Sequence, residues 1–423
     1  MPTTDPNGDD FVADPVGLRE ALELLLAARA DPGSPHPECP TDLFPTAWPQ
    51  SGIGGRAALR ALAPVSLNQS VRLDHPGFLA HMDPPTPWMT WAASMWAAAM
   101  NQNLLHPDVG PAARHLETLV IDWLAPVFGM RGGHLVPGST VANLTALWAA
   151  RELTGARRIV CSAAAHLSIR KSARLLGLGL VEVPVDGAQR LRAELLDDDL
   201  SDAIVVLAAG TVATGAIDPL DAGHGAAWRH VDAAWAGPLR LSSHADVLEG
   251  IQTADSVAVS AHKWLYQPKG CAMVFFADPD AAHDPLTFGG GYLAAPNVGL
   301  LGSAGDRALP LAATLLGWGR QGVAARIDAD MALASRLAEI ISETRDLELW
   351  REPTTGIVNW RSRSVPPEHI RERLRGAWVS TAIIGTETWL RSVSVNPHAD
   401  PELVVAEVRR AANGDSKQAQ SSA

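Results

Sequence analysis

Two short apolar runs, each carrying a charged residue, decide the fold of this chain. The first reads His230-Val231-Asp232-Ala233-Ala234-Trp235, and the second reads Asp255-Ser256-Val257-Ala258-Val259-Ser260-Ala261-His262-Lys263-Trp264. They lie about one βα unit apart, and in an open α/β sheet the residues at the carboxyl ends of strands face the ligand crevice. We therefore expect the carboxylate of Asp232 and the amine of Lys263 to face one crevice.

An acid and an amine in such a crevice suit a cofactor with a protonated ring nitrogen and a carbonyl group. A buried carboxylate needs a cation or strong donors, which a protonated heterocycle supplies. A desolvated lysine loses its proton and attacks a carbonyl. These are the requirements of a pyridoxal phosphate (PLP) site. Taken alone, the same residues also fit a structural aspartate at a strand end and an ordinary lysine.

Composition excludes several other classes of protein. Of the 423 residues, 47% are hydrophobic and 19% charged, which is enough apolar material for a large core. The net charge of −12, with no basic tract to offset it, argues against nucleic acid as a partner. The three cysteines are scattered without a CxxC pair, so we expect neither a disulfide framework nor a metal site.

The same survey predicts a cytoplasmic protein without a membrane partner. Residues 1–14 are polar and acidic and lack the basic and apolar regions of a signal peptide. Apolar runs are short, and the one at 116–124 is interrupted by Glu117 and Asp122.

The order of elements predicts an α/β protein in four parts. These are an N-terminal arm and helix that pack in a dimer (1–73), a large PLP-binding domain (74–320), a small C-terminal α+β domain (321–412) and a disordered tail (413–423). Within the large domain, strands alternate with helices, which predicts a mostly parallel central sheet covered on both faces. Helices are expected at 14–29, 88–102, 111–130, 141–151, 167–176, 193–200, 307–337, 366–375 and 401–412.

A candidate phosphate cradle precedes the two runs. Gly138-Ser139-Thr140 follows a short strand and begins a helix, where free backbone N–H groups and two hydroxyls bind an anion. Ordinary N-cap chemistry at a glycine turn explains the same residues.

Two further candidates lie between the cradle and Asp232. His166 follows a strand, where its ring can stack on a planar cofactor, although a helix-capping or core histidine fits equally. Thr211 follows the strand that ends at Ala209, where its hydroxyl can approach the ring; a plain turn with Gly and Asp-Pro is the alternative. Small Ala234 suits close contact with a ring face.

In this order the motifs GSTxAN, His-x-Ser-x-x-Lys, Gly-Thr-(x)3-Gly-(x)2-Asp-Pro, His-Val-Asp-Ala-Ala and Ser-x-His-Lys-Trp resemble the group II PLP-dependent amino acid decarboxylases. That family includes the aromatic amino acid, glutamate, diaminobutyrate and tyrosine decarboxylases. The resemblance extends from about His75 to Asn396 and includes Glu117 and Trp389-Leu390-Arg391.

The resemblance implies the PLP-dependent transferase type I fold (aspartate aminotransferase-like) and a homodimer with its sites at the subunit interface. It implies that an L-amino acid loses CO2 through an external aldimine and a quinonoid. The implied roles are the Schiff-base lysine for Lys263, the pyridine-nitrogen partner for Asp232, and the two ring faces for His166 and Ala234. The implied phosphate-binding residues are Ser139, Thr140, Ser260 and His262.

The chain departs from the family just after Lys263. The family carries a long mobile loop with a proton-donating tyrosine there. This chain has only two tyrosines: Tyr266, just after the lysine, and Tyr292, near where that loop begins, in a short segment that ends at Arg307. Tyr292 is the candidate proton donor. The alternatives are a histidine donor, or another outcome on the same scaffold: oxidative deamination, transamination or β-elimination. A cofactor-free scaffold is a third hypothesis.

The substrate is weakly encoded. By the resemblance, His81 and Trp88 face the substrate side chain, although a structural histidine in a turn fits His81 as well.

Overall fold

The computed structural model describes residues 11–31, 33, 37 and 47–414. Its largest sheet has seven strands in the order β2-β8-β7-β6-β5-β3-β4. β8 runs antiparallel to both of its neighbours, and the other pairs are parallel. The strands are β2 (Gly132–Val136), β3 (Arg158–Ser162), β4 (Gly179–Val183), β5 (Ala203–Ala208), β6 (Trp228–Asp232), β7 (Ser256–Ser260) and β8 (Ala272–Phe276).

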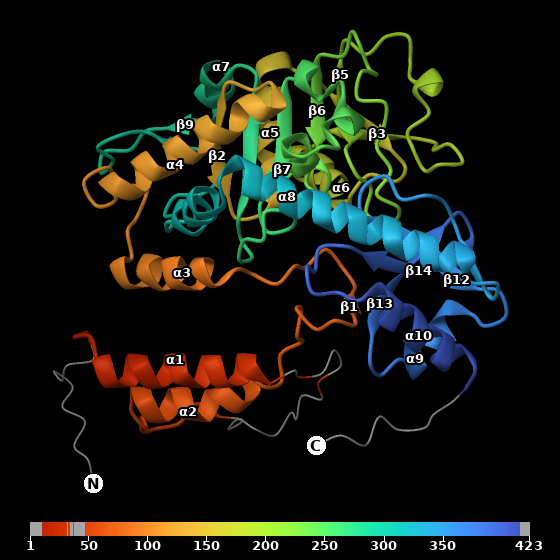
Figure 1. Cartoon of the computed structure of the whole chain (residues 1–423). Helices are drawn as coiled ribbons and strands as arrows, with labels where there is room; N and C mark the ends of the chain where they lie inside the picture. Colours follow the sequence, from red (N-terminus) through yellow and green to blue (C-terminus); the bar gives the residue numbers. More distant parts are fainter. Residues whose placement is uncertain (1–10, 32, 34–36, 38–46, 415–423) are drawn as a thin grey trace.

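Helices cover both faces of this sheet, and its central strands are buried throughout. Every residue of β5, β6, β7 and β8 is buried, as expected for strands without a solvent face. One apolar core joins the sheet to α5 (Ser139–Thr154) and α6 (Leu167–Leu176), and a second joins it to α4 (Pro111–Leu124) and α8 (Ala308–Glu343). Figure 1 shows these layers. The predicted mostly parallel sheet with two covered faces is confirmed.

A smaller sheet forms the C-terminal part. Its order is β1-β13-β14-β12-β11, and α9 (Pro367–Arg373), α10 (Pro401–Ala412) and the second half of α8 pack on it. The strands are β1 (Phe78–Leu79), β11 (Leu347–Leu349), β12 (Ile357–Ser362), β13 (Trp378–Ile384) and β14 (Glu387–Val393). β1 pairs in parallel with β13, so a segment near residue 78 belongs to the C-terminal sheet.

The helix α8 connects the two sheets. It packs on α3 (Trp88–Met100) and α4 in its first part and on β11, β12 and α10 in its second. Gly319 interrupts it with φ 62° and ψ 176°, a backbone conformation that is essentially restricted to glycine. Two smaller pieces complete the large domain: α7 (Pro279–His283) and the pair β9 (Thr287–Phe288) and β10 (Asn297–Val298).

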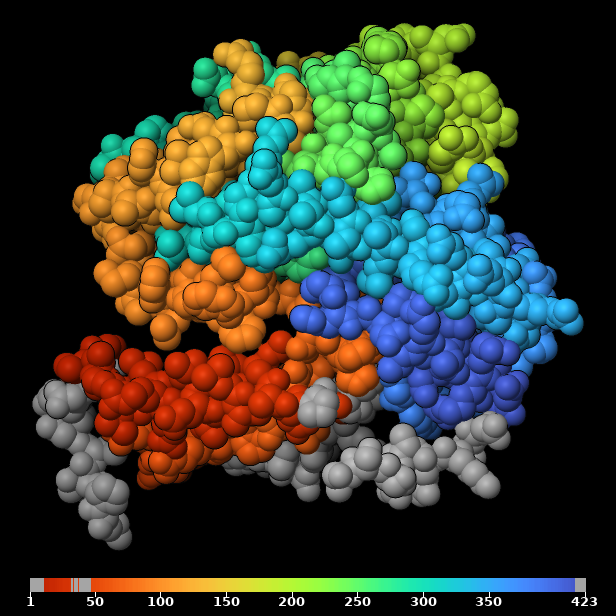
Figure 2. Space-filling view, in the orientation of Figure 1, coloured from red at the N-terminus to blue at the C-terminus, as the bar shows by residue number. Residues whose placement is uncertain are grey.

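The N-terminal part contains two helices that pack against each other, and most of the predicted arm lies outside the described residues. α1 (Pro15–Ala30) and α2 (Gly55–Ser66) are joined by the ion pairs Arg56–Asp14, with 2.6 Å between Nε and Oδ2, and Arg60–Glu20. The helix pair contacts α3 at one end, where the Arg29 guanidinium lies 5.3 Å from the centre of the Trp91 ring. Figure 2 shows it as a layer below α3 that meets the rest of the chain on the side of the C-terminal part.

Two local predictions need correction. The helix expected at 193–200 is only a single 3-10 turn, η2 (Ala193–Leu195). Three consecutive aspartates end that stretch, and negative charge is unfavourable at a helix C-terminus; Asp197 pairs with Arg158 of β3 instead. The helix α2 and the strand β13 were not predicted. The tail expected to be disordered lies, from residue 415 onward, outside the described residues.

Candidate active site

Lys263 lies in the turn that follows β7, three residues after the last residue of that strand. Its backbone carbonyl accepts a hydrogen bond from Tyr266 N, which closes the turn. Burial, together with the nearby charges of Lys269 and Arg391, lowers the pKa of its amine to about 8, against the opposing effect of Asp232. At physiological pH an appreciable fraction of this amine is therefore neutral and nucleophilic.

Asp232 is the last residue of β6, the strand next to β7. Its side chain is buried, and both carboxylate oxygens accept hydrogen bonds from neutral donors: Oδ2 from Asn143 Nδ2 at 2.8 Å and Oδ1 from Ala234 N at 3.2 Å. In the described part of the chain, no lysine, arginine or histidine lies within ion-pair distance of it. A buried carboxylate held this way can take one more partner, a cation.

His166 is the N-cap of α6. It therefore has the helix-capping role, and its ring remains a candidate for stacking on a cofactor. Its Nδ1 accepts a hydrogen bond from Ser168 N at 3.2 Å and lies 2.7 Å from the Ser168 hydroxyl oxygen. Burial lowers the pKa of the ring, so the neutral form is favoured. Because Nδ1 accepts, the proton of the neutral ring is on Nε2, and that edge is available to a ligand.

The turn that carries the cradle residues lies close to His262. Ser139 and Thr140 are the first residues of α5, whose opening N–H groups have no intrahelical acceptor. A Cβ added at Gly138, where φ is 126°, would lie 4.0 Å from His262 Cε1, so the turn before α5 touches the turn after β7. The Ser260 hydroxyl beside them is buried without a partner. Free amides and an orphaned hydroxyl fit the phosphate of PLP.

Thr211 and Ala234 flank Asp232 at the ends of β5 and β6. The Thr211 side chain is buried, and its hydroxyl lies 3.0 Å from Thr214 Oγ1 and accepts from Ala216 N. Ala209 N, at the same strand end, donates to the carbonyl of Asp232. The backbone two residues before Thr211 thus lies beside that of Asp232, and the Thr211 hydroxyl has its partners within its own turn.

The other three candidate residues do not join the cluster around Lys263 and Asp232 in the single chain. Trp88, the first residue of α3, is 70% exposed, and Tyr292 is 75% exposed in the segment between β9 and β10. His81 is exposed in a turn with φ 56°, and its ring lies edge-on to Trp378 at 6.1 Å.

Sequence reasoning assigned no role to two buried residues of the site. Asn143 joins Asp232 to Ser168 and to His230. Arg391 of β14 is 5% exposed; its Nη1 donates to Ser380 Oγ at 3.3 Å and its Nε has no partner. Burial lowers the pKa of Arg391 to about 10, so the group remains a cation at neutral pH. Both occur inside the quoted motifs, and polar residues within apolar runs are the signal that points to them.

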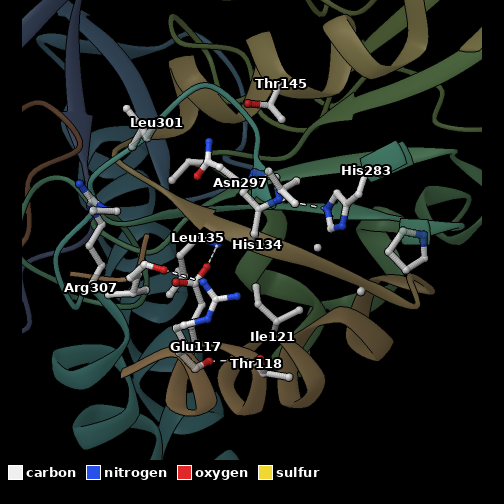
Figure 3. A pocket seen from close by; sticks show the side chains of 18 of the residues that line it. Glu117, Thr118, Ile121, His134, Leu135, Thr145, His283, Asn297, Leu301 and Arg307 are labelled. Atoms are coloured by element: carbon white, nitrogen blue, oxygen red, sulfur yellow. Dashed lines mark hydrogen bonds between the residues drawn. The ribbon is translucent and has the colours of Figure 1, made fainter. Parts of the chain in front are cut away.

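A separate cavity of about 500 Å³ lies between α4, β2 and residues 296–307 (Figure 3). The carboxylate of Glu117 in this cavity accepts from Leu135 N at 3.0 Å, and burial raises its pKa. His134 Nδ1 lies 3.1 Å from His283 Nε2, and burial lowers the pKa of His134 to about 3. Neither Lys263 nor Asp232 lines the cavity, so it is distinct from the cluster described above.

Residues 63–363 match the family model described as the pyridoxal-dependent decarboxylase conserved domain. The chain belongs to this family. It is 30% identical to the L-2,4-diaminobutyrate decarboxylase of Rhizobium meliloti (strain 1021), covering 84% of this chain and 81% of that protein. It is 29% identical to the aspartate 1-decarboxylase of Aliivibrio fischeri (strain ATCC 700601 / ES114), covering 77% of this chain and 71% of that protein.

Solved structures agree on the fold. The crystal structure of Oryza sativa TDC with PLP and tryptamine superimposes with a TM-score of 0.87 at 20% identity, covering 98% of this chain and all of that one. The expected type I fold is therefore confirmed. This family member is a PLP-dependent carboxy-lyase that acts on an amino acid. Among the described residues, no helix is long and apolar enough to cross a membrane.

Proposed function

We propose that the cluster around Lys263 and Asp232 is the site where this decarboxylase binds PLP and removes CO2 from an L-amino acid. The observation that carries the proposal is the juxtaposition of an amine whose pKa is about 8 with a buried, cation-free carboxylate on the neighbouring strand. PLP, when bound, supplies the electron sink for the electron pair released as the carboxylate leaves.

Each residue of the cluster then has a role that follows from its chemistry. Lys263 attaches the cofactor covalently, and Asp232 holds a proton at the ring nitrogen. His166 and Ala234 contact the two faces of the ring, with Thr211 beside Asp232. The first-turn amides of α5 with Ser139, Thr140, Ser260 and His262 bind the phosphate. Tyr292 is the candidate proton donor, and its exposure in the single chain is consistent with a site completed by a second subunit.

Arg391 is the residue we propose to bind a carboxylate of the substrate. A buried guanidinium with an unpartnered Nε carries a desolvation cost that a bidentate carboxylate offsets. Its charge lowers the pKa of Lys263, so the two groups share one electrostatic environment. We assign His81 and Trp88 to the substrate side chain.

We propose that the active form is a homodimer with its sites at the subunit interface. In the single chain, α1 exposes apolar side chains that a soluble protein normally covers. Val16, Leu18, Leu22 and Leu26 are each at least half exposed, and Met95, Trp96 and Met100 of α3 are exposed as well. A second copy that covers these helices removes this surface from water. We place the protein in the cytoplasm, where Cys161 and Cys271, both buried and unpaired, stay reduced.

The decisive experiment is product analysis of the purified holoenzyme with a panel of L-amino acids. Mass spectrometry should find an amine and CO2 in equal amounts from one of them. Lys263→Ala should abolish this product and the covalent PLP adduct that borohydride reduction traps in the wild type. Decarboxylation that survives in Lys263→Ala, or an adduct on another residue, would refute the proposal.

A further inference from the structure

A continuous chain of buried hydrogen bonds connects Asp232 to His166. Asn143 Nδ2 donates to Asp232 Oδ2 at 2.8 Å and to Ser168 Oγ at 2.9 Å, and the Ser168 hydroxyl lies 2.7 Å from His166 Nδ1. Asn143 and Ser168 are fully buried. Asp232 and His166 are thus joined through the Asn143 amide and the Ser168 hydroxyl.

The chain continues on the other side of Asn143. His230 Nε2 lies 3.0 Å from Asn143 Oδ1, His230 Nδ1 lies 2.9 Å from Ser256 Oγ, and Trp228 Nε1 donates to Ser256 Oγ at 2.8 Å. All three residues are buried.

Donor and acceptor chemistry determines every proton in this chain. A carboxylate only accepts, so the NH2 group of Asn143 faces Asp232 and Ser168 and its Oδ1 faces His230. His230 Nε2 therefore carries the ring proton and donates to Asn143 Oδ1. Burial lowers the pKa of His230 to about 4, so the ring is neutral and its Nδ1 accepts from the Ser256 hydroxyl, whose oxygen accepts from Trp228 Nε1.

The same logic reaches His166. Ser168 N donates to His166 Nδ1, which makes Nδ1 an acceptor, so the Ser168 hydroxyl accepts from Asn143 and directs its own proton to Nδ1. Nδ1 is therefore an acceptor, and the proton of the neutral ring is on Nε2. Within the described residues, Nε2 has no hydrogen-bond partner of its own.

We infer that Asn143 is a positioning residue that couples the acid at the cofactor ring nitrogen to the histidine over the ring, by orienting Asp232 and setting the tautomer of His166 through Ser168. The inference rests on the proposed function. Asn143 touches neither the reacting atoms nor the substrate; it acts through Asp232 and Ser168. His230, Ser256 and Trp228 hold the amide in its orientation. A fully paired network of this kind specifies one arrangement of its members.

The test compares Asn143→Ala and Ser168→Ala with Ser172→Ala, a buried serine one turn further along α6. In the holoenzyme, Asn143→Ala should lower kcat about tenfold to a hundredfold with little change in KM, as loss of a supporting hydrogen bond does elsewhere. Ser168→Ala should lower kcat less, and the double variant should match Asn143→Ala alone, because both act through one chain. Additive effects, or an equal loss in Ser172→Ala, would overturn the inference.

A second measurement does not depend on enzyme activity, and it does not require the Asn143→Ala variant to fold. In the apoprotein labelled with 15N-histidine, the ring nitrogens of His166, assigned by loss of signal in His166→Gln, should show Nε2 protonated. Their resonances should change in Ser168→Ala and remain in Ser172→Ala. Unchanged resonances in Ser168→Ala would contradict the inference. Failure of the proposed function would instead appear as decarboxylation that persists in Lys263→Ala.

Discussion

Tyr266, three residues after Lys263, donates its phenol hydrogen bond to the carboxylate of Asp330 in α8. Tyr266 has φ 57°, in the left-handed region that costs a non-glycine residue roughly 1 kcal/mol or more. Next to it, Gln267 Nε2 donates to Thr314 Oγ1 at 2.9 Å, also in α8. These two contacts hold the strained turn that carries the reactive amine.

Asp330 makes the stability of the protein depend on pH. Burial raises its pKa to about 7, against the lowering effect of Tyr266. Between about pH 4 and 7, Asp330 is therefore protonated in the native state and ionised in the unfolded chain. The free energy of unfolding falls as the pH rises through this window. Asp330→Asn should remove this decline, which amounts to a few kcal/mol at about 1.4 kcal/mol per pKa unit.

Urea unfolding of the wild type and Asp330→Asn at equal protein concentration, from pH 4.5 to 8, measures the effect. Tyr266→Phe should extend the decline to higher pH, because the carboxylate then loses the donor that lowers its pKa. Parallel stability curves for the wild type and Asp330→Asn would show that Asp330 titrates normally.

The amine of Lys263 should react with PLP at a lower pH than an ordinary lysine. Its pKa of about 8 means that the neutral fraction, and with it the rate of covalent attachment to the apoprotein, rises through pH 8 and then levels off. Lys269→Met should move the midpoint upward, because it removes a cation that lowers this pKa. Stopped-flow absorbance follows the attachment; a rate that still rises steeply near pH 10 would contradict the prediction.

Gly356 and Gly385 form a matched pair for the packing behind Lys263. Both have left-handed φ values, 71° and 62°, but a Cβ at Gly356 would lie 2.9 Å from the Trp264 ring, while a Cβ at Gly385 would meet no atom within 4 Å. Each alanine should cost about 1 kcal/mol from the backbone. Gly356→Ala should cost more and also lower kcat, because it displaces the residue next to Lys263. Equal losses of stability and unchanged kcat in both variants would exclude this contact.

Arg391 should control substrate binding. Arg391→Met should raise KM by about tenfold to a hundredfold, the effect of losing a charge-assisted pair of roughly 1.5–3 kcal/mol, and Arg391→Lys should recover part of it. Arg361→Met is the control, since Arg361 of the neighbouring strand pairs with Glu348 and Glu387. Steady-state kinetics with the identified substrate decides; equal effects of the Arg361 and Arg391 variants would argue against the assignment.

The subunit interface should be sensitive to charge on α1. The double variant Leu22→Asp and Leu26→Asp should shift the mass measured by light scattering toward one chain, because it places two carboxylates in the proposed apolar contact. Leu175→Asp on α6, where the native leucine is 72% exposed, should leave the mass unchanged. A wild-type mass of a single chain at micromolar concentration would refute the homodimer.

Some of this architecture was predictable and some was not, for identifiable reasons. The strands that end at Asp232 and Ser260 are short, contain β-branched valines and are bounded by turns, so they are readily recognised. Helix α2 begins at a glycine pair and contains Pro64, so its pattern is weak. Asn143 and Arg391 were quoted within motifs, but their partners lie far away in the sequence. Only the folded chain brings Asn143 to Asp232 and Ser168, and a single sequence contains no record of such contacts.

The break in α8 at Gly319 has a mechanical consequence. Gln267 is hydrogen-bonded to Thr314 before the break, and Tyr266 is hydrogen-bonded to Asp330 after it. The turn that follows Lys263 therefore connects the two halves of the helix. The second half packs on the sheet that contains Arg391. The turn that carries the reactive amine is therefore bonded to both halves of α8, and through the second half it is connected to the sheet that contains Arg391.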